Sequence, residues 1–427
     1  MNDERIGVIA DDVTGACDVA AELREIGLTV DVLLGVPAQE DLPDDGGAVV
    51  IGLRTRTAPR AVAVDDSLAA AEWLRRRGIT RWYQKYCSTF DSTPEGMIGP
   101  VAEALMAAGG FAASVGTPCT PHADRTVYRG HLFVGDRLVS ESSLAHHPLT
   151  PMTDPDLVRV LGRQTTLPVG LVRHRDVRAG PPALAAAIRT ASAPHLLVDA
   201  LDERDLDSIA IAVEALDPCL VGGGAGLITA LARRAGPGGR TSDPVEAHQG
   251  GRRLILVGSA SERTRAQVAR GGPVTATVDA VAAAADGGDE VARALALLED
   301  FWMRHPDRPA VVSASHDLEA LRLAQQALGV ERAGAAVEDA LAAIALGSVK
   351  RLGARHLLIA GGETSGAVTR ALGIERLRLT RRVDAGVAWG IGAAGAVAGG
   401  PRLHVLLKSG NFGGEDLFVR AWEAAAT

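Results

Sequence analysis

The 427-residue sequence contains no long hydrophobic run and no excess of positive charge. A membrane-spanning helix needs about 20 consecutive apolar residues, and no stretch of the sequence approaches that length. The net charge of −8 argues against a general nucleic-acid binder, because the phosphate backbone selects proteins with a basic face. The first residues, MNDERIGVIADD, are acidic where a signal peptide is basic, so a cytoplasmic location is expected.

Cysteine and aromatic residues are scarce as well. The four cysteines form no CxxC pair and share no zinc-like spacing with the eleven histidines. Reduced thiols are therefore expected, and neither a disulfide framework nor a structural zinc site is predicted. Aromatic residues make up 3% of the chain, so the core must be built from alanine, valine and leucine.

Lysine is the rarest basic residue. Of the 44 basic residues, all but Lys85, Lys350 and Lys408 are arginine. A chain that uses arginine almost everywhere can retain lysine where a compact ammonium group is needed. Three lysines can equally be what a biased composition leaves behind.

The apolar runs of the first half predict an α/β domain. Short β-rich runs at 6–10, 29–34 and 48–53 alternate with helical segments such as 16–26 and 60–77. This alternation requires a mostly parallel sheet with helices on both faces. One hairpin interrupts it, because TVYRGHLF and RLVSES flank a short turn at 134–136.

The second half predicts another α/β domain of the same class. The length of the chain exceeds what one compact core usually holds. Residues 236–251 are polar and rich in glycine and proline, and they are the best candidate for a linker. Beyond them the strand pattern restarts at 253–257 and continues at 310–313, 356–360 and 403–407. The predicted domains are therefore 1–235 and 252–427.

Four strands of the second domain end in loops of small and hydroxyl residues. Ligands of open α/β sheets bind beyond the carboxyl ends of the strands. Glycine lets backbone N–H groups approach an anion there, and a following helix N-terminus favours negative charge. No Walker A sequence occurs, and tight turns or helix caps are the bland alternative. The loops are GSAS (258–261), SAS (313–315), GGETSG (361–366) and KSGNFGG (408–414).

The first domain places charged residues after its strands. Asp11 and Asp12 follow a buried strand, where two adjacent carboxylates repel unless a cation or substrate hydroxyls compensate them. Helix capping by Asp12 or Thr14 is the structural alternative. Arg54 and Arg56 lie two residues apart after another strand. Such a pair suits bidentate capture of a carboxylate or phosphate, although a solvated edge also explains it.

The segment 83–100, YQKYCSTFDSTPEGMIGP, contains the densest set of polar residues. One lysine, one aspartate and four hydroxyl residues fall within nine positions, which suits a polyol ligand and a general base. His146 and His147 are more often structural than catalytic, although they could contact a substrate. The set consists of Lys85, Ser88, Thr89, Asp91, Ser92 and Thr93.

Together these segments resemble the four-carbon acid sugar kinase family. Loop KYCSTFDST followed by IGPV is similar to the 3-oxo-tetronate 4-kinase branch, whereas the threonate and erythronate kinase branch carries a KxDSTLRG-type loop. Met97 stands where the branch usually has asparagine, and Arg54 replaces a more usual lysine. The matching motifs, in order, are ADDVTGA, RTRT, KYCSTFDST, TVYRGHLFV, HHPLTPMTDP, VDALDE, GGGAGL, GSAS, GGETSG and KSGNFGGEDLF.

The resemblance implies a sugar-acid domain followed by an ATP domain, with the active site in the cleft between them. The implied reaction is MgATP-dependent phosphorylation of the 4-hydroxyl of 3-oxo-tetronate. Lys85 is then a catalytic residue, and Asp12 is preferred to Asp91 as the base that takes the hydroxyl proton. The implied substrate-binding residues are Asp11, Arg54, Arg56, Ser88, Ser92 and Thr93.

The resemblance also implies how ATP and Mg²⁺ are bound. Glu363 is an indirect Mg²⁺ ligand in this interpretation. Lys85 and Lys408 lie in two of the strongest motifs and become candidate ligands, whereas Lys350 is the compositional leftover. The implied ATP-binding residues are Ser259, Ser261, Gly361, Gly362, Glu363, Thr364, Gly410 and Gly413.

Two other functions remain open at the level of sequence. A D-threonate or D-erythronate 4-kinase would share the fold, because a loop cannot settle a preference between carbonyl and hydroxyl. A non-catalytic sugar-acid or nucleotide sensor would keep the loops and lose the base. The expected partners are a small sugar acid and ATP, and a homodimer is considered as the assembly.

Overall fold

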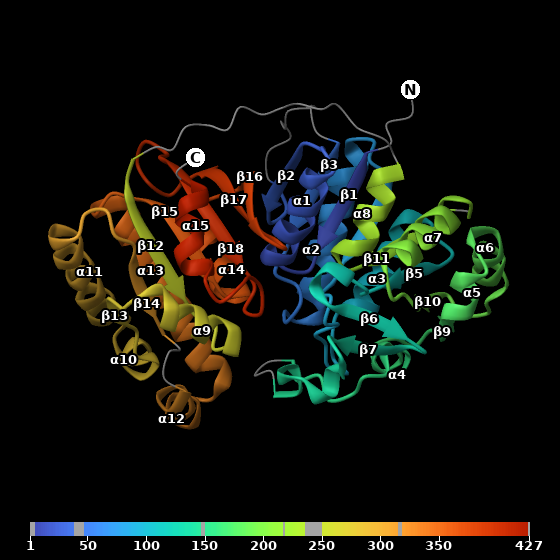
Figure 1. The fold of residues 1–427 in the computed structure, drawn as a ribbon, viewed down its shortest axis with the longest axis horizontal. Coiled ribbons are helices and arrows are strands. Elements are labelled where there is room, and N and C mark those ends of the chain that lie inside the picture. Colours follow the sequence, from blue (N-terminus) through green and yellow to red (C-terminus); the bar gives the residue numbers. More distant parts are fainter. Residues whose placement is uncertain are drawn as a thin grey trace. The chain divides into compact units, whose positions relative to one another are not determined.

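The computed structural model describes residues 5–37, 47–146, 150–216, 218–234, 250–314 and 318–425. The chain folds into two compact units, Met1–Thr241 and Ser242–Thr427, and each is an α/β structure (Figure 1). This confirms the predicted fold class. The predicted linker at 236–251 lies almost wholly outside the described residues, so its boundaries stay a prediction. Within the described part of the chain, no helix is long and apolar enough to cross a membrane.

The first unit contains a sheet whose described pairings are all parallel. Its interior strand β1 is the sequence IGVIA, which is buried at every position, as a strand covered on both faces must be. In spatial order the strands are β2 (Val30–Leu34), β3 (Ala48–Gly52), β1 (Ile6–Ala10), β4 (Arg81–Lys85), β11 (Leu220–Gly223), β5 (Ser114–Thr117), β10 (His195–Val198) and β9 (Val169–Val172).

Helices cover both faces of this sheet. On one face, α2 (Arg60–Arg76) and α3 (Ile98–Gly109) pack over a core that includes Trp73 and Trp82. On the other face, α1 (Val13–Glu25) packs against α8 (Ala225–Arg234). The remaining helices of the unit are α4 (Leu157–Gly162), α5 (His174–Arg178), α6 (Pro181–Thr190) and α7 (Glu203–Glu214), with 3-10 turns η1 (Pro121–Ala123), η2 (Val139–Glu141) and η3 (Ser143–His146).

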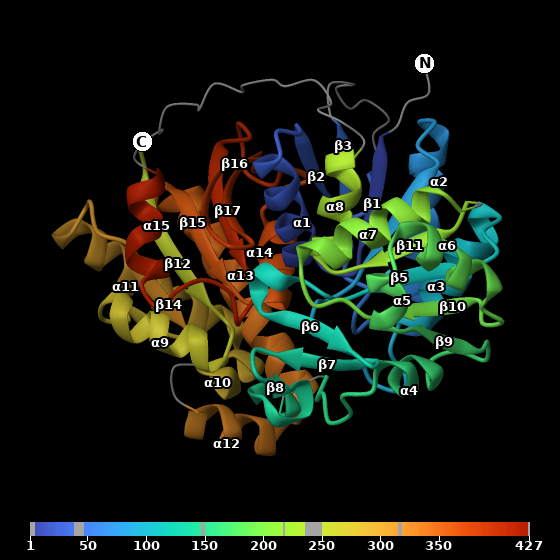
Figure 2. The same cartoon turned by 45° about the vertical axis from the view of Figure 1, so that its right-hand side comes forward.

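The predicted hairpin is a three-stranded meander, which corrects the sequence interpretation. TVYRGHLF is two antiparallel strands, β6 (Arg125–Tyr128) and β7 (His131–Val134), followed by β8 (Arg137–Leu138) (Figure 2). The chain reverses at Arg129 and Gly130, which both have positive φ values. The Asp199 carboxylate accepts the backbone N–H groups of these two residues. That distant carboxylate fixes a turn that the local sequence did not reveal.

The second unit has a mixed sheet. Its parallel strands follow the prediction, while β16 and β17 form antiparallel pairs at one side, which the sequence analysis missed. In spatial order the strands are β13 (Ala276–Thr277), β14 (Ala310–Ser313), β12 (Arg252–Val257), β15 (Ala354–Ala360), β18 (Arg402–Lys408), β17 (Val387–Ala393) and β16 (Arg376–Asp384).

Helices also enclose the second sheet. The helices α9 (Glu262–Gly271) and α15 (Leu417–Ala425) pack over a core that contains Phe418 and Trp389. The other helices are α10 (Ala280–Ala285), α11 (Gly287–Arg304), α12 (Leu318–Leu328), α13 (Val330–Arg351) and α14 (Gly362–Ala371).

Candidate active site

Three adjacent strand ends of the first unit meet at one level. Ala10 at the end of β1 is in register with Gly52 at the end of β3 and with Lys85 at the end of β4. The backbone N–H of Asp11 donates to the Lys85 carbonyl, at 3.0 Å. The loops that follow these strands therefore begin side by side, as the sequence analysis predicts for a ligand site.

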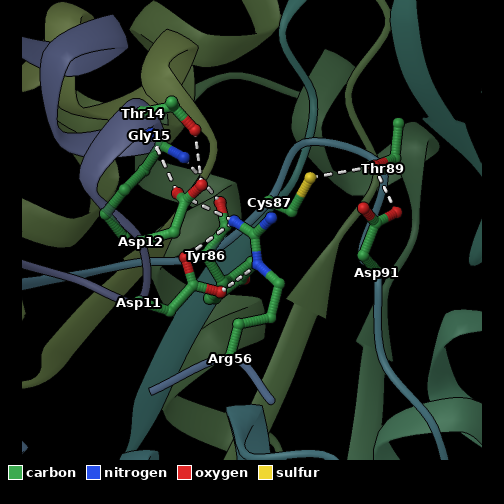
Figure 3. A network of polar contacts seen from close by, with 10 residues as sticks. Asp11, Asp12, Thr14, Gly15, Arg56, Tyr86, Cys87, Thr89 and Asp91 are labelled. Atoms are coloured by element: carbon green, nitrogen blue, oxygen red, sulfur yellow. Dashed lines mark hydrogen bonds and ion pairs between the residues drawn. The ribbon is translucent and has the colours of Figure 1, made fainter. Parts of the chain in front are cut away.

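The central feature of this site is Arg56, which lies between Asp11 and Asp12 (Figure 3). Its Nε and Nη2 atoms donate to the two carboxylate oxygens of Asp11, each at 3.0 Å. Nη2 also lies 2.9 Å from Oδ1 of Asp12. One planar guanidinium therefore compensates both acids. The cation that the adjacent carboxylates require is thus a side chain of the protein itself.

Asp12 is the N-cap of α1, which is the structural role considered for it as an alternative to substrate binding. Its Oδ1 atom accepts the backbone N–H of Gly15 at 2.8 Å, and its Oδ2 atom accepts the Thr14 hydroxyl at 2.5 Å. A Cβ atom on Gly15 would lie 3.1 Å from Nζ of Lys85. Glycine at this position therefore lets the first turn of α1 approach the lysine closely.

The two acids differ in their ionisation. Burial is the largest influence on Asp11 and raises its pKa above the ordinary value, despite the neighbouring Arg56. Burial acts in the same direction on Asp12, but Arg56, Lys85 and the hydrogen bonds outweigh it and lower the pKa of Asp12. Although burial opposes the charge of Arg56, Asp11 and Asp12 raise the pKa of Arg56 well above its ordinary value. Asp12 is therefore a firmly held anion.

A small pocket lies beside this ion-pair network. Five predicted site residues line it: Asp11, Arg56, Lys85, Asp91 and Ser92. The other lining residues are Ile9, Ala10, Thr55, Ser67, Gln84, Tyr86, Met97, Ile98 and Val101. This mixture of charged and apolar side chains suits a small polar ligand.

Four of the predicted residues of this unit are described by the structure but do not line the pocket. They are Asp12, Arg54, Ser88 and Thr93. Asp12 instead pairs with the Arg56 guanidinium. Ser88 is 5% exposed, and Thr93 presents its carbonyl oxygen to Gln164 at 2.9 Å. Of the two histidines considered, His147 lies outside the described residues.

The loop after β4 is fixed by its own side chains. The Thr89 hydroxyl donates to Asp91 at 2.5 Å, and the Cys87 thiol lies 2.8 Å from the same hydroxyl oxygen (Figure 3). Burial raises the pKa of Cys87, so its thiol is protonated at neutral pH. Asp91 therefore occupies a defined position in the pocket wall.

Gln164 supports this loop and was missed by the sequence analysis. Its side-chain amide donates to the Ser92 hydroxyl at 2.5 Å and to the Thr93 carbonyl. Its carbonyl oxygen accepts the backbone N–H of Gly99 at the start of α3. No motif surrounds this glutamine, so only the tertiary structure connects it to residues some 70 positions earlier.

In the second unit, the predicted glycine-rich loops start at one level. Val257, Ala360 and Lys408 are in register at the ends of β12, β15 and β18. A Cβ atom on Gly258 would collide with the Thr364 hydroxyl, and one on Gly410 would lie 2.6 Å from Oγ of Ser259. The absent side chains thus let three loops converge. The last residue of the fourth loop, SAS, lies outside the described residues.

Two helices begin in these loops. Ser261 is the N-cap of α9, and its side chain accepts the backbone N–H of Thr264. Gly361 precedes α14 with a φ value of +132°, which a residue with a side chain rarely adopts. Helix N-termini and exposed backbone N–H groups attract anions, so this edge of the sheet is suited to phosphate.

Both motif lysines are buried and bind backbone carbonyl groups. Lys85 is 2% exposed, and its Nζ donates to the Tyr86 carbonyl at 2.9 Å. Lys408 is fully buried and donates to the Gly410 carbonyl at 3.0 Å and to the Thr264 hydroxyl at 2.7 Å. Burial, with a smaller effect of Arg263, lowers the pKa of Lys408 to about 7. Each lysine therefore positions the loop that follows its own strand.

Sequence profiles of two domain families match the chain. The profile of a sugar-binding N-terminal domain matches residues 6–231, and that of a nucleotide-binding C-terminal domain matches residues 254–418. A 3-oxo-tetronate kinase of Burkholderia multivorans is 44% identical over 98% of this chain and 97% of its own. One of Pseudomonas fluorescens is 42% identical over 97% of this chain and 96% of its own.

Solved structures share the fold over the whole length. A protein of Salmonella typhimurium LT2 superposes with a TM-score of 0.80 and 37% identity, covering 98% of both chains. A protein of Haemophilus influenzae superposes with a TM-score of 0.72 and 35% identity, covering 98% of this chain and 99% of its own.

Proposed function

Because this chain belongs to the four-carbon acid sugar kinase family, in its 3-oxo-tetronate kinase branch, we propose that it phosphorylates the 4-hydroxyl of 3-oxo-tetronate with ATP. The observation that carries the proposal is the full-length similarity to kinases of that name. The polar pocket of one unit and the glycine-rich strand ends of the other support it. A cytoplasmic location and a homodimer stay predictions.

The pocket of the first unit is the proposed sugar-acid site. Arg56, Lys85 and Ser92 supply donors for the oxygen atoms of a four-carbon acid, and Asp91 supplies an acceptor. Arg56 is already bound to Asp11, so it is held in one orientation before the substrate arrives. This preorganisation reduces the entropy that substrate binding costs.

We assign the general base to Asp91 rather than to Asp12. The Asp12 carboxylate accepts from Gly15 and Thr14 and pairs with Arg56, and its pKa is lowered. Such a carboxylate is a weak proton acceptor. Asp91 lines the pocket and is oriented by Thr89. In the reaction, the 4-oxygen attacks the γ-phosphorus, the bond to the β-phosphate oxygen breaks, and the hydroxyl proton passes to Asp91 as ADP leaves.

The converging loops of the second unit are the proposed ATP site. A Cβ atom at Gly258 or Gly410 would collide with a side chain of a neighbouring loop, so these glycines let the loops pack close together. Backbone N–H groups of such loops at helix N-termini can bind phosphate oxygens. Lys408 donates to the Gly410 carbonyl and thereby orients the last loop. Glu363 lies in the first turn of α14 and is the residue proposed to hold Mg²⁺ indirectly. When bound, Mg²⁺ neutralises charge on the transferred phosphoryl group.

The test is ADP release from ATP with a panel of 3-oxo-tetronates, D-threonate and D-erythronate. We expect the largest kcat/KM with a 3-oxo-tetronate. A larger kcat/KM with D-threonate or D-erythronate would move the chain to the other branch of the family. If no four-carbon acid accelerates ADP release, the kinase proposal is wrong and a sensor role gains support.

A further inference from the structure

A second group of ionisable side chains lies on α1. Asp18 and Glu22 are one helical turn apart, so their side chains share a face of the helix. His122, from the 3-10 turn η1, meets them, with Nε2 lying 3.6 Å from Oε1 of Glu22. None of the three lines the sugar-acid pocket. This carboxylate–histidine cluster is therefore not part of the site described above.

The cluster has the dimensions of a cation site. One ligand atom of each residue lies within 4.8 Å of those of the other two. Around a zinc ion with bonds of about 2.1 Å, tetrahedral ligand atoms lie about 3.4 Å apart. Small rotations of the side chains would therefore bring three ligands onto one ion. Carboxylate oxygen and imidazole nitrogen are both ligand types that zinc accepts.

The burial of Asp18 is the second observation that points to a ligand. Its side chain is 95% buried, since the residue is 5% exposed. Its Oδ1 atom is inaccessible to solvent and has no hydrogen-bond partner among the described residues. A buried carboxylate oxygen without a partner costs free energy, because it loses its hydration without compensation. A bound cation supplies that compensation.

We infer that Asp18, Glu22 and His122 bind a divalent transition-metal ion such as Zn²⁺. The ion would link the middle of α1 to the loop between β5 and β6. Lys85 and Arg125 lie within electrostatic range of Asp18 and reduce the negative potential, while Asp12 adds to it. The two nearby cations should therefore weaken the affinity of this site for a divalent ion. This site revises the expectation that the chain holds no structural zinc, and it does not depend on the kinase proposal.

The probe is ZnCl₂ alone, titrated into the chelator-treated full chain without nucleotide or sugar acid. Calorimetry should show that the wild type binds one equivalent of zinc. The dissociation constant should rise at least tenfold in His122→Gln and in Asp18→Asn. His122 has a side chain that is 23% exposed, so its substitution should leave the fold intact. His305→Gln, at the end of α11, is the matched control and should bind zinc as the wild type does.

Substitution of Co²⁺ for Zn²⁺ identifies the ligands directly. Ligation by carboxylate and imidazole predicts d–d absorption without the thiolate-to-cobalt charge-transfer band that Cys17 or Cys87 would give. Unchanged zinc affinity in His122→Gln, or a thiolate band, would overturn the proposal. So would a wild type that binds no zinc.

Discussion

Individual carboxylates of the sugar-acid site are assigned different tasks by their hydrogen bonds. Asp12 is bound by Gly15, Thr14 and Arg56, whereas Asp91 accepts from one side chain among the described residues, Thr89. We predict that Asp91→Asn lowers kcat by about two to four orders of magnitude, because the amide cannot accept the hydroxyl proton. Steady-state and single-turnover kinetics measure this loss.

The matched variant is Asp12→Asn. It removes one charge from the Arg56 network and weakens the cap of α1, so it should lower thermal stability as well as activity. Asp91→Asn should leave thermal stability nearly unchanged. A near wild-type kcat in Asp91→Asn would return the base to Asp12.

The amine of Lys408 should make the stability of the second unit depend on pH. Its pKa is about 7 in the folded chain, against an ordinary value of 10.5. Between these values the unfolded chain binds more protons than the folded chain, so the free energy of unfolding rises with pH across this window. Below pH 7 both forms are protonated, and the cost of the buried charge is present in full. We predict that the slope, at most about 1.4 kcal/mol per pH unit, disappears in Lys408→Met.

Urea denaturation at several pH values checks this slope. Pulsed hydrogen exchange of the backbone amides of β18 reports the unfolding of the second unit alone. The exposed Lys350 offers the control, because Lys350→Met should keep the wild-type slope. An identical slope in wild type and Lys408→Met would contradict the lowered pKa.

Several single residues could be predicted from the sequence because local patterns mark them. Asp11, Arg56 and Asp91 follow strands in polar motifs, and the structure places all three at the pocket. The scarcity of lysine in the sequence drew attention to Lys85 and Lys408. Their motifs did not predict that both side chains are buried and donate to backbone carbonyl groups. Gln164 carried no signal, because its contacts arise from the tertiary fold alone.

Among the larger elements, the strand-to-helix loops of the second unit depend on their glycines. We predict that Gly258→Ala raises the KM for ATP at least tenfold, because the new Cβ collides with the Thr364 side chain and separates two loops. The KM for the sugar acid should change little. Kinetics with each substrate varied in turn measure the difference.

Gly334→Ala is the control for this substitution. Gly334 lies within α13, where an added Cβ meets no atom within 4 Å. Alanine there should be neutral or should stabilise the helix by up to about 1 kcal/mol. Equal effects of the two variants on the KM for ATP would show that the loops do not hold the nucleotide.

Elements with strong local patterns were predicted well, and those fixed by distant contacts were not. Buried runs such as 6–10 and 310–313 are strands in the structure. The helix expected at 16–26 begins three residues earlier, at Val13, because Asp12 caps it. The reversal at Arg129 and Gly130 depends on Asp199, which lies some 70 residues further along the chain.

For the whole molecule, the two units should respond to different ligands. We predict that a non-hydrolysable ATP analogue slows hydrogen exchange mainly in the loops at 258–261, 361–366 and 408–414. A 3-oxo-tetronate should slow exchange mainly in the loops after β1, β3 and β4. Hydrogen exchange of the full chain with each ligand measures both patterns. Protection by the analogue confined to the first unit would contradict the assignment of the two sites.

The burial of two lysines also decides where amine-directed chemistry can attach to the protein. Lys85 and Lys408 are 2% and 0% exposed, whereas Lys350 lies exposed near the end of α13. These are the only lysines of the sequence. An ester-activated dye or biotin should therefore modify a single side-chain amine, which fluorescence or immobilised assays can use without altering either set of loops.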